Sequence, residues 1–198
     1  TKTDLGELVF LERLSDLQRL RSGETFPPQF VETRLRFSPY IKDIMTVGDE
    51  TRDFVAALIN IDMAVLSRWA EDKRIGFSTF TDLSQRPEIA SLLSQEIARV
   101  NQFLPEHARV RRFANFPKEL DPDEGELTRS RKLRREFLEE RYGALISGLY
   151  DGSSQVRIDI PVTYQDGRRS NFEALVFIHE TEACPPGGSG LTRSKGGT

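Results

Sequence analysis

The chain has 198 residues, of which 30% are charged and 37% hydrophobic, a composition typical of a globular domain with a modest core. Its net charge is −3 and its pI near 5.6, so the surface as a whole is not built to hold nucleic acid. One cysteine, Cys184, excludes an internal disulfide and favours a reducing, cytoplasmic location, and one cysteine with two histidines is too few ligands for a usual zinc site.

The first part of the chain is predicted to alternate strands and short helices. Residues 8–11 are an apolar run typical of a buried strand, and 27–37 begin with two prolines and continue with a helical stripe that Ser38-Pro39 ends. Residues 41–47 and 54–61 are predicted as two strands around a Gly-Asp-Glu turn. The second is apolar on both faces, which is typical of a middle strand covered by helices on both sides.

The middle of the chain is predicted to be mainly helical. Asp62 caps a short helix, and Pro87 opens a longer one that Pro105 ends. A third strand is predicted at 108–116, and a long final helix at roughly 130–150.

After residue 151 the hydrophobic pattern changes to period two. Residues 156–164 and 172–179 are predicted to pair as a hairpin around Asp166-Gly167, and Pro161 indicates an edge strand. The stretch 181–198 is rich in Gly, Pro, Ser and Lys and is predicted to be disordered. The fold class predicted is α+β: a small mixed sheet of about three strands flanked by helices, with a C-terminal β-hairpin extension at 151–180.

The most distinctive stretch lies at 126–135, where an acidic loop is followed by five cations in seven residues. Thr128 or Ser130 is predicted to cap the final helix, which would place Lys132 in its first turn. The helix dipole prefers anions there, so a negative group is expected nearby. Two sources remain open at this point: carboxylates of the chain, or a ligand phosphate. The carboxylates in question are Asp121, Asp123 and Glu124.

Two motifs carry a resemblance to a known family. One is LERLSDL at 11–17 with GETFPPQFVE at 23–32, and the other is LTRSRKLRR at 127–135. The first is similar to the hinge motif of AMP-forming acyl-CoA synthetases, and the second to the C-terminal lysine motif of their long-chain branch. The resemblance covers about 4–150 and implies the small C-terminal lid of these enzymes at 14–150. Residues 1–13 then correspond to the end of the large adenylating domain, the rest of which the chain lacks.

The resemblance implies a two-step ligase. A fatty carboxylate attacks the α-phosphate of ATP to give acyl-adenylate and pyrophosphate, and the thiol of coenzyme A then displaces AMP. Mg²⁺ would arrive with ATP and be held mainly by the absent domain, as would the fatty acid. Such a fragment is expected to be inactive alone and to bind no nucleic acid, and peripheral membrane association of the parent enzyme is left open.

Specific residues match the family's functional positions. Lys132 matches the lysine that neutralises the reacting carboxylate and phosphate, a form of electrostatic stabilisation. Asp4 and Arg13 match the pair that contacts the ribose, and Ser15 occupies the hinge position. Gly23 and Glu24 match the loop that approaches coenzyme A, and Arg19 falls where a cation often serves the same step. No residue is expected to bind a metal directly.

Two other interpretations stay open. In the first, the chain is a binding module whose basic residues at 129–135, joined by Arg109, Arg111 and Arg112, hold nucleic acid or acidic lipid. In the second, it is a degenerate fragment that only folds.

Overall fold

The computed structural model describes residues 17–163 and 169–181. The predicted strand at 8–11, the turn at Asp166-Gly167 and nearly all of the predicted tail lie outside these residues. The elements follow in chain order: β1 Gln18–Arg19, β2 Thr25–Phe26, α1 Pro28–Leu35, β3 Ile41–Val47, β4 Val55–Ile61, α2 Met63–Asp72, α3 Phe80–Ser84, α4 Pro87–Asn101, η2 Glu106–Ala108, β5 Val110–Asn115, α5 Arg135–Arg141, α6 Gly143–Tyr150, β6 Gln155–Thr163 and β7 Arg169–Glu180.

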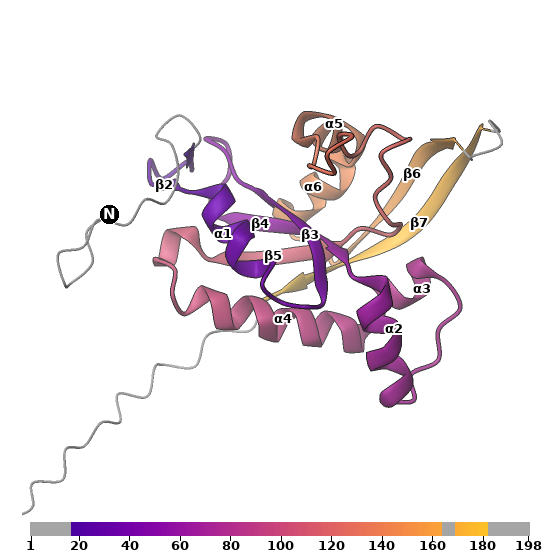
Figure 1. Cartoon of the computed structure of the whole chain (residues 1–198). Coiled ribbons are helices and arrows are strands. Elements are labelled where there is room, and N and C mark those ends of the chain that lie inside the picture. The colour runs from indigo at the N-terminus through magenta and orange to yellow at the C-terminus, as the bar shows by residue number, and fades with distance from the viewer. Residues whose placement is uncertain (1–16, 164–168, 182–198) are drawn as a thin grey trace, which may run out of the picture.

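A five-stranded mixed sheet forms the centre of the fold, in the order β3-β4-β5-β7-β6, and the predicted α+β class is confirmed (Figure 1). β4 and β5 run parallel, and the other neighbours are antiparallel. The predicted hairpin is β6–β7, and it continues the sheet, because β7 pairs with β5 from Arg112↔Glu180 to Ala114↔Ile178. Pro161 lies in the edge strand β6, as its missing N–H predicted.

Two cores lie on opposite faces of this sheet. Alternate β4 residues such as Ala57 and Ile59 join a core with α1 and α4, whereas Ala56 and Leu58 join a second core with α5, α6 and the β6–β7 hairpin. In Figure 1, α4 lies below the sheet and α5 and α6 above it. Every residue of β4 is buried, which explains why its sequence is apolar at successive positions.

Local signals mark the starts of α1, α2 and α4. The Asp62 carboxylate accepts a hydrogen bond from the Val65 backbone N–H at 3.0 Å, so it caps α2 as expected. Pro28 and Pro87 stand in the first turns of α1 and α4. Among the described residues, no helix has both the length and the apolar character to cross a membrane.

The predicted final helix at 130–150 was wrong in two respects. Helix α5 begins only at Arg135, so neither Thr128 nor Ser130 caps it and Lys132 does not lie in its first turn. The helix also breaks at Tyr142, which has φ −106° and ψ 21°, before α6 resumes at Gly143. The break coincides with Gly143, a poor helix former, and with a buried hydrogen bond from the Tyr142 hydroxyl to Glu126.

Candidate functional site

Residues 126–134 form a closed loop that carries Lys132. Its two sides meet at an isolated antiparallel bridge between Leu127 and Leu133, and the Arg134 backbone N–H donates to the Glu126 carbonyl at 3.0 Å. Inside the loop, the Lys132 backbone is held twice by Thr128. The Thr128 N–H donates to the Lys132 carbonyl at 2.8 Å, and the Thr128 hydroxyl oxygen accepts from the Lys132 N–H at 3.0 Å. The loop therefore fixes the main chain from which the Lys132 side chain projects.

The Lys132 side chain is exposed, and among the described residues it makes no hydrogen bond or ion pair. The Arg129 side chain is also exposed, and it too makes no hydrogen bond or ion pair among the described residues. Of the three acids weighed as neutralising groups, Glu124 pairs with Lys118 and Arg141 at 3.1 and 2.6 Å. Among the described residues, no ion pair joins Asp121, Asp123 or Glu124 to a cation of 129–135, so the alternative in which these acids neutralise the basic loop is not supported.

The last two cations of the basic stretch are structural. Arg134 lies over the Phe137 ring, 5.4 Å from its centroid, and donates to the Gly125 carbonyl at 3.1 Å. Arg135 donates to the Thr46 carbonyl at 3.1 Å and forms an ion pair with Glu32. Burial raises the pKa of Glu32, and the Arg135 charge opposes that rise. These contacts connect the end of the loop to β3 and α1.

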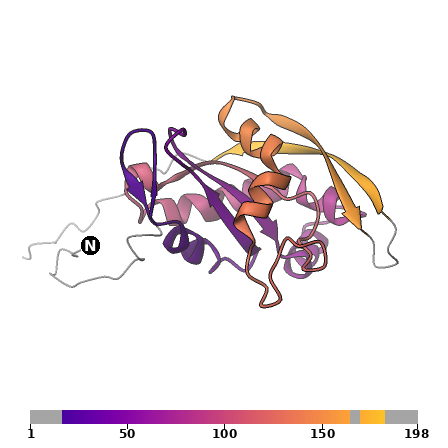
Figure 2. The same cartoon turned by 90° about the horizontal axis from the view of Figure 1, so that it is seen from above.

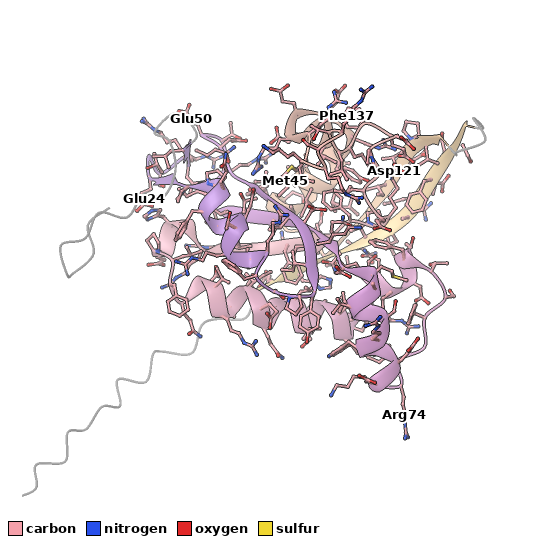
Figure 3. All side chains as sticks on the ribbon, in the orientation of Figure 1. Glu24, Met45, Glu50, Arg74, Asp121 and Phe137 are labelled. Carbon is pink, nitrogen blue, oxygen red and sulfur yellow. The ribbon has the colours of Figure 1, made fainter. Side chains whose placement is uncertain are left out.

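A buried charged cluster supports the loop from below. Glu126, Glu124, Lys118 and Arg141 bring two carboxylates and two cations together, and Tyr142 donates its hydroxyl to Glu126 at 3.0 Å. Burial, together with the Glu126 charge, raises the pKa of the Tyr142 hydroxyl, so it stays protonated and remains a donor. Figure 3 shows how densely side chains fill the region between Asp121 and Phe137.

The second predicted group of residues lies on the β1–β2 hairpin. Gly23 adopts φ +86°, which favours glycine, and a Cβ there would meet no atom within 4 Å. Glu24 accepts from the Ser22 hydroxyl at 3.2 Å and lies 3.4 Å from His107 Nδ1. Arg19 is exposed and lines an open groove of about 660 Å³ together with Leu17, Gln18, Thr25, Gly48, Asp49 and Glu50.

The structure does not bring Lys132 together with the hairpin residues. Leu20 and Phe26 of the hairpin belong to the core on the α1 and α4 face, whereas Leu127 and Leu133 belong to the core on the α5 and α6 face. Seen from above, the β1–β2 hairpin lies on the side of the N-terminus, and α5 and α6, which follow the Lys132 loop, lie between it and most of β6–β7 (Figure 2). Asp4, Arg13 and Ser15 lie outside the described residues, so their predicted roles stay predictions.

Of the three arginines expected to join the basic stretch, Arg109 and Arg112 donate to main-chain carbonyls, and Arg111 lies 3.9 Å from the Glu106 carboxylate. Arg112 donates to the carbonyls of Leu149 at 2.8 Å and Gly148 at 3.3 Å, and Arg109 donates to the Leu104 carbonyl at 3.1 Å. Within residues 17–163 and 169–181, no group of three or more His, Cys, Asp or Glu side chains could hold a metal ion.

Comparison with known proteins gives consistent results. The family described as AMP-binding enzyme C-terminal domain matches residues 16–154. Long-chain-fatty-acid–CoA ligase FadD15 of Mycobacterium tuberculosis is 25% identical over 147 residues, which cover 74% of this chain and 24% of that protein. Long chain acyl-CoA synthetase 8 of Arabidopsis thaliana is 25% identical over 152 residues, 73% of this chain and 20% of that protein. The chain thus spans about a quarter or less of the length of these curated relatives.

A solved structure also resembles the chain in fold. The adenylation domain of a carboxylate reductase from Mycobacterium chelonae superposes with a TM-score of 0.55 at 23% identity, over 73% of this chain and 21% of that one. At this level of identity the likeness concerns the fold alone.

Proposed function

Because the chain belongs to the AMP-binding enzyme C-terminal domain family, we propose that it is the lid of a fatty acid–CoA ligase of the long-chain type. The observation that carries the proposal is the Lys132 loop. Its main chain is fixed by Thr128 and by the Leu127–Leu133 bridge, while the Lys132 ammonium stays exposed and unpaired among the described residues. A compact cation held in this way is suited to neutralise anionic reactants that another domain presents.

In the proposed first step, an oxygen of the fatty carboxylate attacks the α-phosphorus of ATP and pyrophosphate leaves. Lys132 would neutralise oxygens of both the carboxylate and the α-phosphate as they approach. Mg²⁺ bound with ATP would be held mainly by the adenylating domain. Asp4 and Arg13 would contact the ribose, the Asp carboxylate as acceptor and the Arg guanidinium as a fixed donor.

In the proposed second step, the thiol of coenzyme A gives up its proton to solvent, its sulfur attacks the acyl carbon, and AMP leaves with the electron pair of the broken bond. The lid would turn about Ser15 so that Lys132 withdraws and the Gly23-Glu24 turn approaches the pantetheine arm. The open space around Gly23 supports this role, since main chain without a side chain can come close to a ligand. Arg19, exposed beside the groove, would serve the same step.

In the experiment, this whole chain is fused to the adenylating portion of a long-chain ligase such as FadD15. It replaces the segment of FadD15, about a quarter of that protein, to which this chain is similar. The first step is measured as fatty-acid-dependent exchange between ATP and pyrophosphate. We expect exchange from the native graft and a loss of roughly 100-fold or more in Lys132→Ala, because a preorganised charge of this kind contributes about that much. Arg129→Ala is the matched control, since Arg129 is equally exposed and unpaired in the same loop.

Three outcomes decide the proposal. Exchange that survives in Arg129→Ala and is lost in Lys132→Ala supports it. Equal exchange in both variants would remove Lys132 from the mechanism. A native graft that folds but catalyses no exchange would contradict the proposed lid function. The same holds if exchange is still absent after the separate, ungrafted chain is added to the reaction.

A further inference from the structure

The buried carboxylate under the Lys132 loop is fully used by its neighbours. Glu126 has no exposed surface, and its Oε1 accepts from the Tyr142 hydroxyl at 3.0 Å and lies 3.5 Å from Arg141 Nε. Its Oε2 accepts from Lys118 Nζ at 2.6 Å and from the Asp121 backbone N–H at 3.0 Å. A carboxylate removed from water is stable only with such partners, and removing one of them leaves a buried charge unpaired.

The two cations that contact Glu126 also pair with a second carboxylate, that of Glu124. Lys118 Nζ and Arg141 also contact the Glu124 carboxylate, at 3.1 and 2.6 Å, so two cations meet two carboxylates. The four side chains are at most 14% exposed. Solvent therefore screens these contacts weakly, and the cluster is well suited to hold Glu126 in one place.

The main chain of Glu126 is the root of the Lys132 loop. Its carbonyl accepts from the Arg134 N–H at 3.0 Å, and the next residue, Leu127, bridges Leu133. Both sides of the loop thus begin at or beside Glu126, and Lys132 lies two residues from Arg134. A shift of the Glu126 main chain would be passed directly to Lys132, because the loop is closed by its own hydrogen bonds.

We propose that Glu126 is the positioning residue for Lys132: its buried carboxylate, held by Lys118, Arg141 and Tyr142, fixes the root of the loop and so the place from which the ammonium reaches the reactants. The inference rests on the proposed function. A lysine side chain is long and flexible, so the remaining control over its position is the main chain beneath it. A displacement of about 1 Å in a catalytic group can lower a rate about 100-fold.

The test separates the two half-reactions in the grafted ligase. Glu126→Gln keeps the size of the side chain but removes its charge and turns one of its two acceptors into a donor, which faces either Lys118 or Arg141. We expect ATP–pyrophosphate exchange to fall roughly 10- to 100-fold. The second half-reaction, thioester formed from supplied acyl-adenylate and coenzyme A, should keep its rate, because Lys132 does not act in it. Tyr142→Phe removes a single hydroxyl and should lower exchange in the same direction by a smaller factor.

Asn101→Ala is the matched control for loss of stability. Asn101 is buried and makes two hydrogen bonds, to the Val110 carbonyl at 2.9 Å and from the Val110 N–H at 3.0 Å. It lies on α4, on the other side of the sheet from the Lys132 loop. If Glu126→Gln lowers both half-reactions equally, as a destabilised lid would, the positioning role is overturned. If Glu126→Gln is insoluble, Tyr142→Phe decides by the same comparison.

A second readout needs no ligase. Trypsin cuts after Arg129, Arg131 and Lys132, and the rate of cutting in the whole chain reports how firmly the loop is held. We expect Glu126→Gln and Tyr142→Phe to be cut faster at these three sites, as identified by mass spectrometry, and Asn101→Ala to be cut at the native rate there. Unchanged cutting in both loop variants would overturn the inference. If trypsin cuts Glu126→Gln and Tyr142→Phe faster as expected, but the native graft catalyses no ATP–pyrophosphate exchange, the proposed function is contradicted and the support of the loop by Glu126 is not.

Discussion

The residue type at some positions of this fold is explained by tertiary contacts that cannot be read from the sequence. Gly148 lies in α6, where glycine is a poor helix former, yet a Cβ at this position would come within 2.3 Å of Val156 Cγ2 and 3.0 Å of Ile178 Cδ1. Val156 is β-branched and cannot rotate away easily. The missing side chain therefore allows α6 to approach the β6–β7 hairpin.

Gly148→Ala should destabilise the chain by about 1–3 kcal/mol, since overpacking outweighs the gain in helix propensity of about 1 kcal/mol. Gly143→Ala is the control in the same helix, because a Cβ there would meet no atom within 4 Å. It should leave stability unchanged or raise it by up to about 1 kcal/mol. Urea unfolding followed by circular dichroism measures both. Equal loss in the two variants would mean that helix geometry, and not the contact with Val156, is the cause.

Elements were predictable where their signals are local. Pro28, Asp62 and Pro87 mark helix starts in the sequence, and β4 is apolar on both faces because both are covered. The break in the predicted final helix lies at Tyr142 and coincides with the Tyr142–Glu126 hydrogen bond, which joins residues 16 apart and leaves no local pattern. The Arg135–Glu32 ion pair joins residues 103 apart, and no local pattern encodes it. Lys132 was found by resemblance to a family motif, whereas the role of Glu126 emerges only from its buried partners.

The β6–β7 hairpin is an element whose two faces differ. Ile178 is 7% exposed and faces α6, whereas Leu175 of the same strand is 42% exposed on the other face. Ile178→Ala should cost about 2–4 kcal/mol because it leaves a cavity in the core. Leu175→Ala should change stability by about 0.5 kcal/mol or less. Urea unfolding compares the two, and a similar loss in both would contradict the assignment of the buried face.

At the scale of the whole molecule, the sheet separates the two candidate regions. The Lys132 loop joins the core of one face and the β1–β2 hairpin the core of the other. If the lid presents them in turn, variants in each region should impair different half-reactions of the grafted ligase. A change in one region should then leave the other step intact.

Gly23→Ala should slow thioester formation severalfold and leave ATP–pyrophosphate exchange at the native rate. The added methyl meets no atom, so its effect comes from the φ of +86°, which costs an L-residue about 1 kcal/mol and shifts the turn. Gly152→Ala is the control, because Gly152 has φ +85° and equal space in a distant turn. Loss of thioester formation in both variants would show that strain alone, and not the place of Gly23, is responsible.

The edge strand β6 has a consequence for how copies of the chain behave toward one another. An open sheet edge offers unpaired main-chain groups on which a strand of another molecule can build, and such growth leads to aggregation. Pro161 has no backbone N–H that could donate to another strand, and its carbonyl already accepts a hydrogen bond from Arg141. The part of the exposed edge around Pro161, near the end of β6, is therefore a poor template for intermolecular pairing. We therefore expect Arg141, which also belongs to the buried cluster, to disfavour cross-β association through the β6 edge by occupying the Pro161 carbonyl.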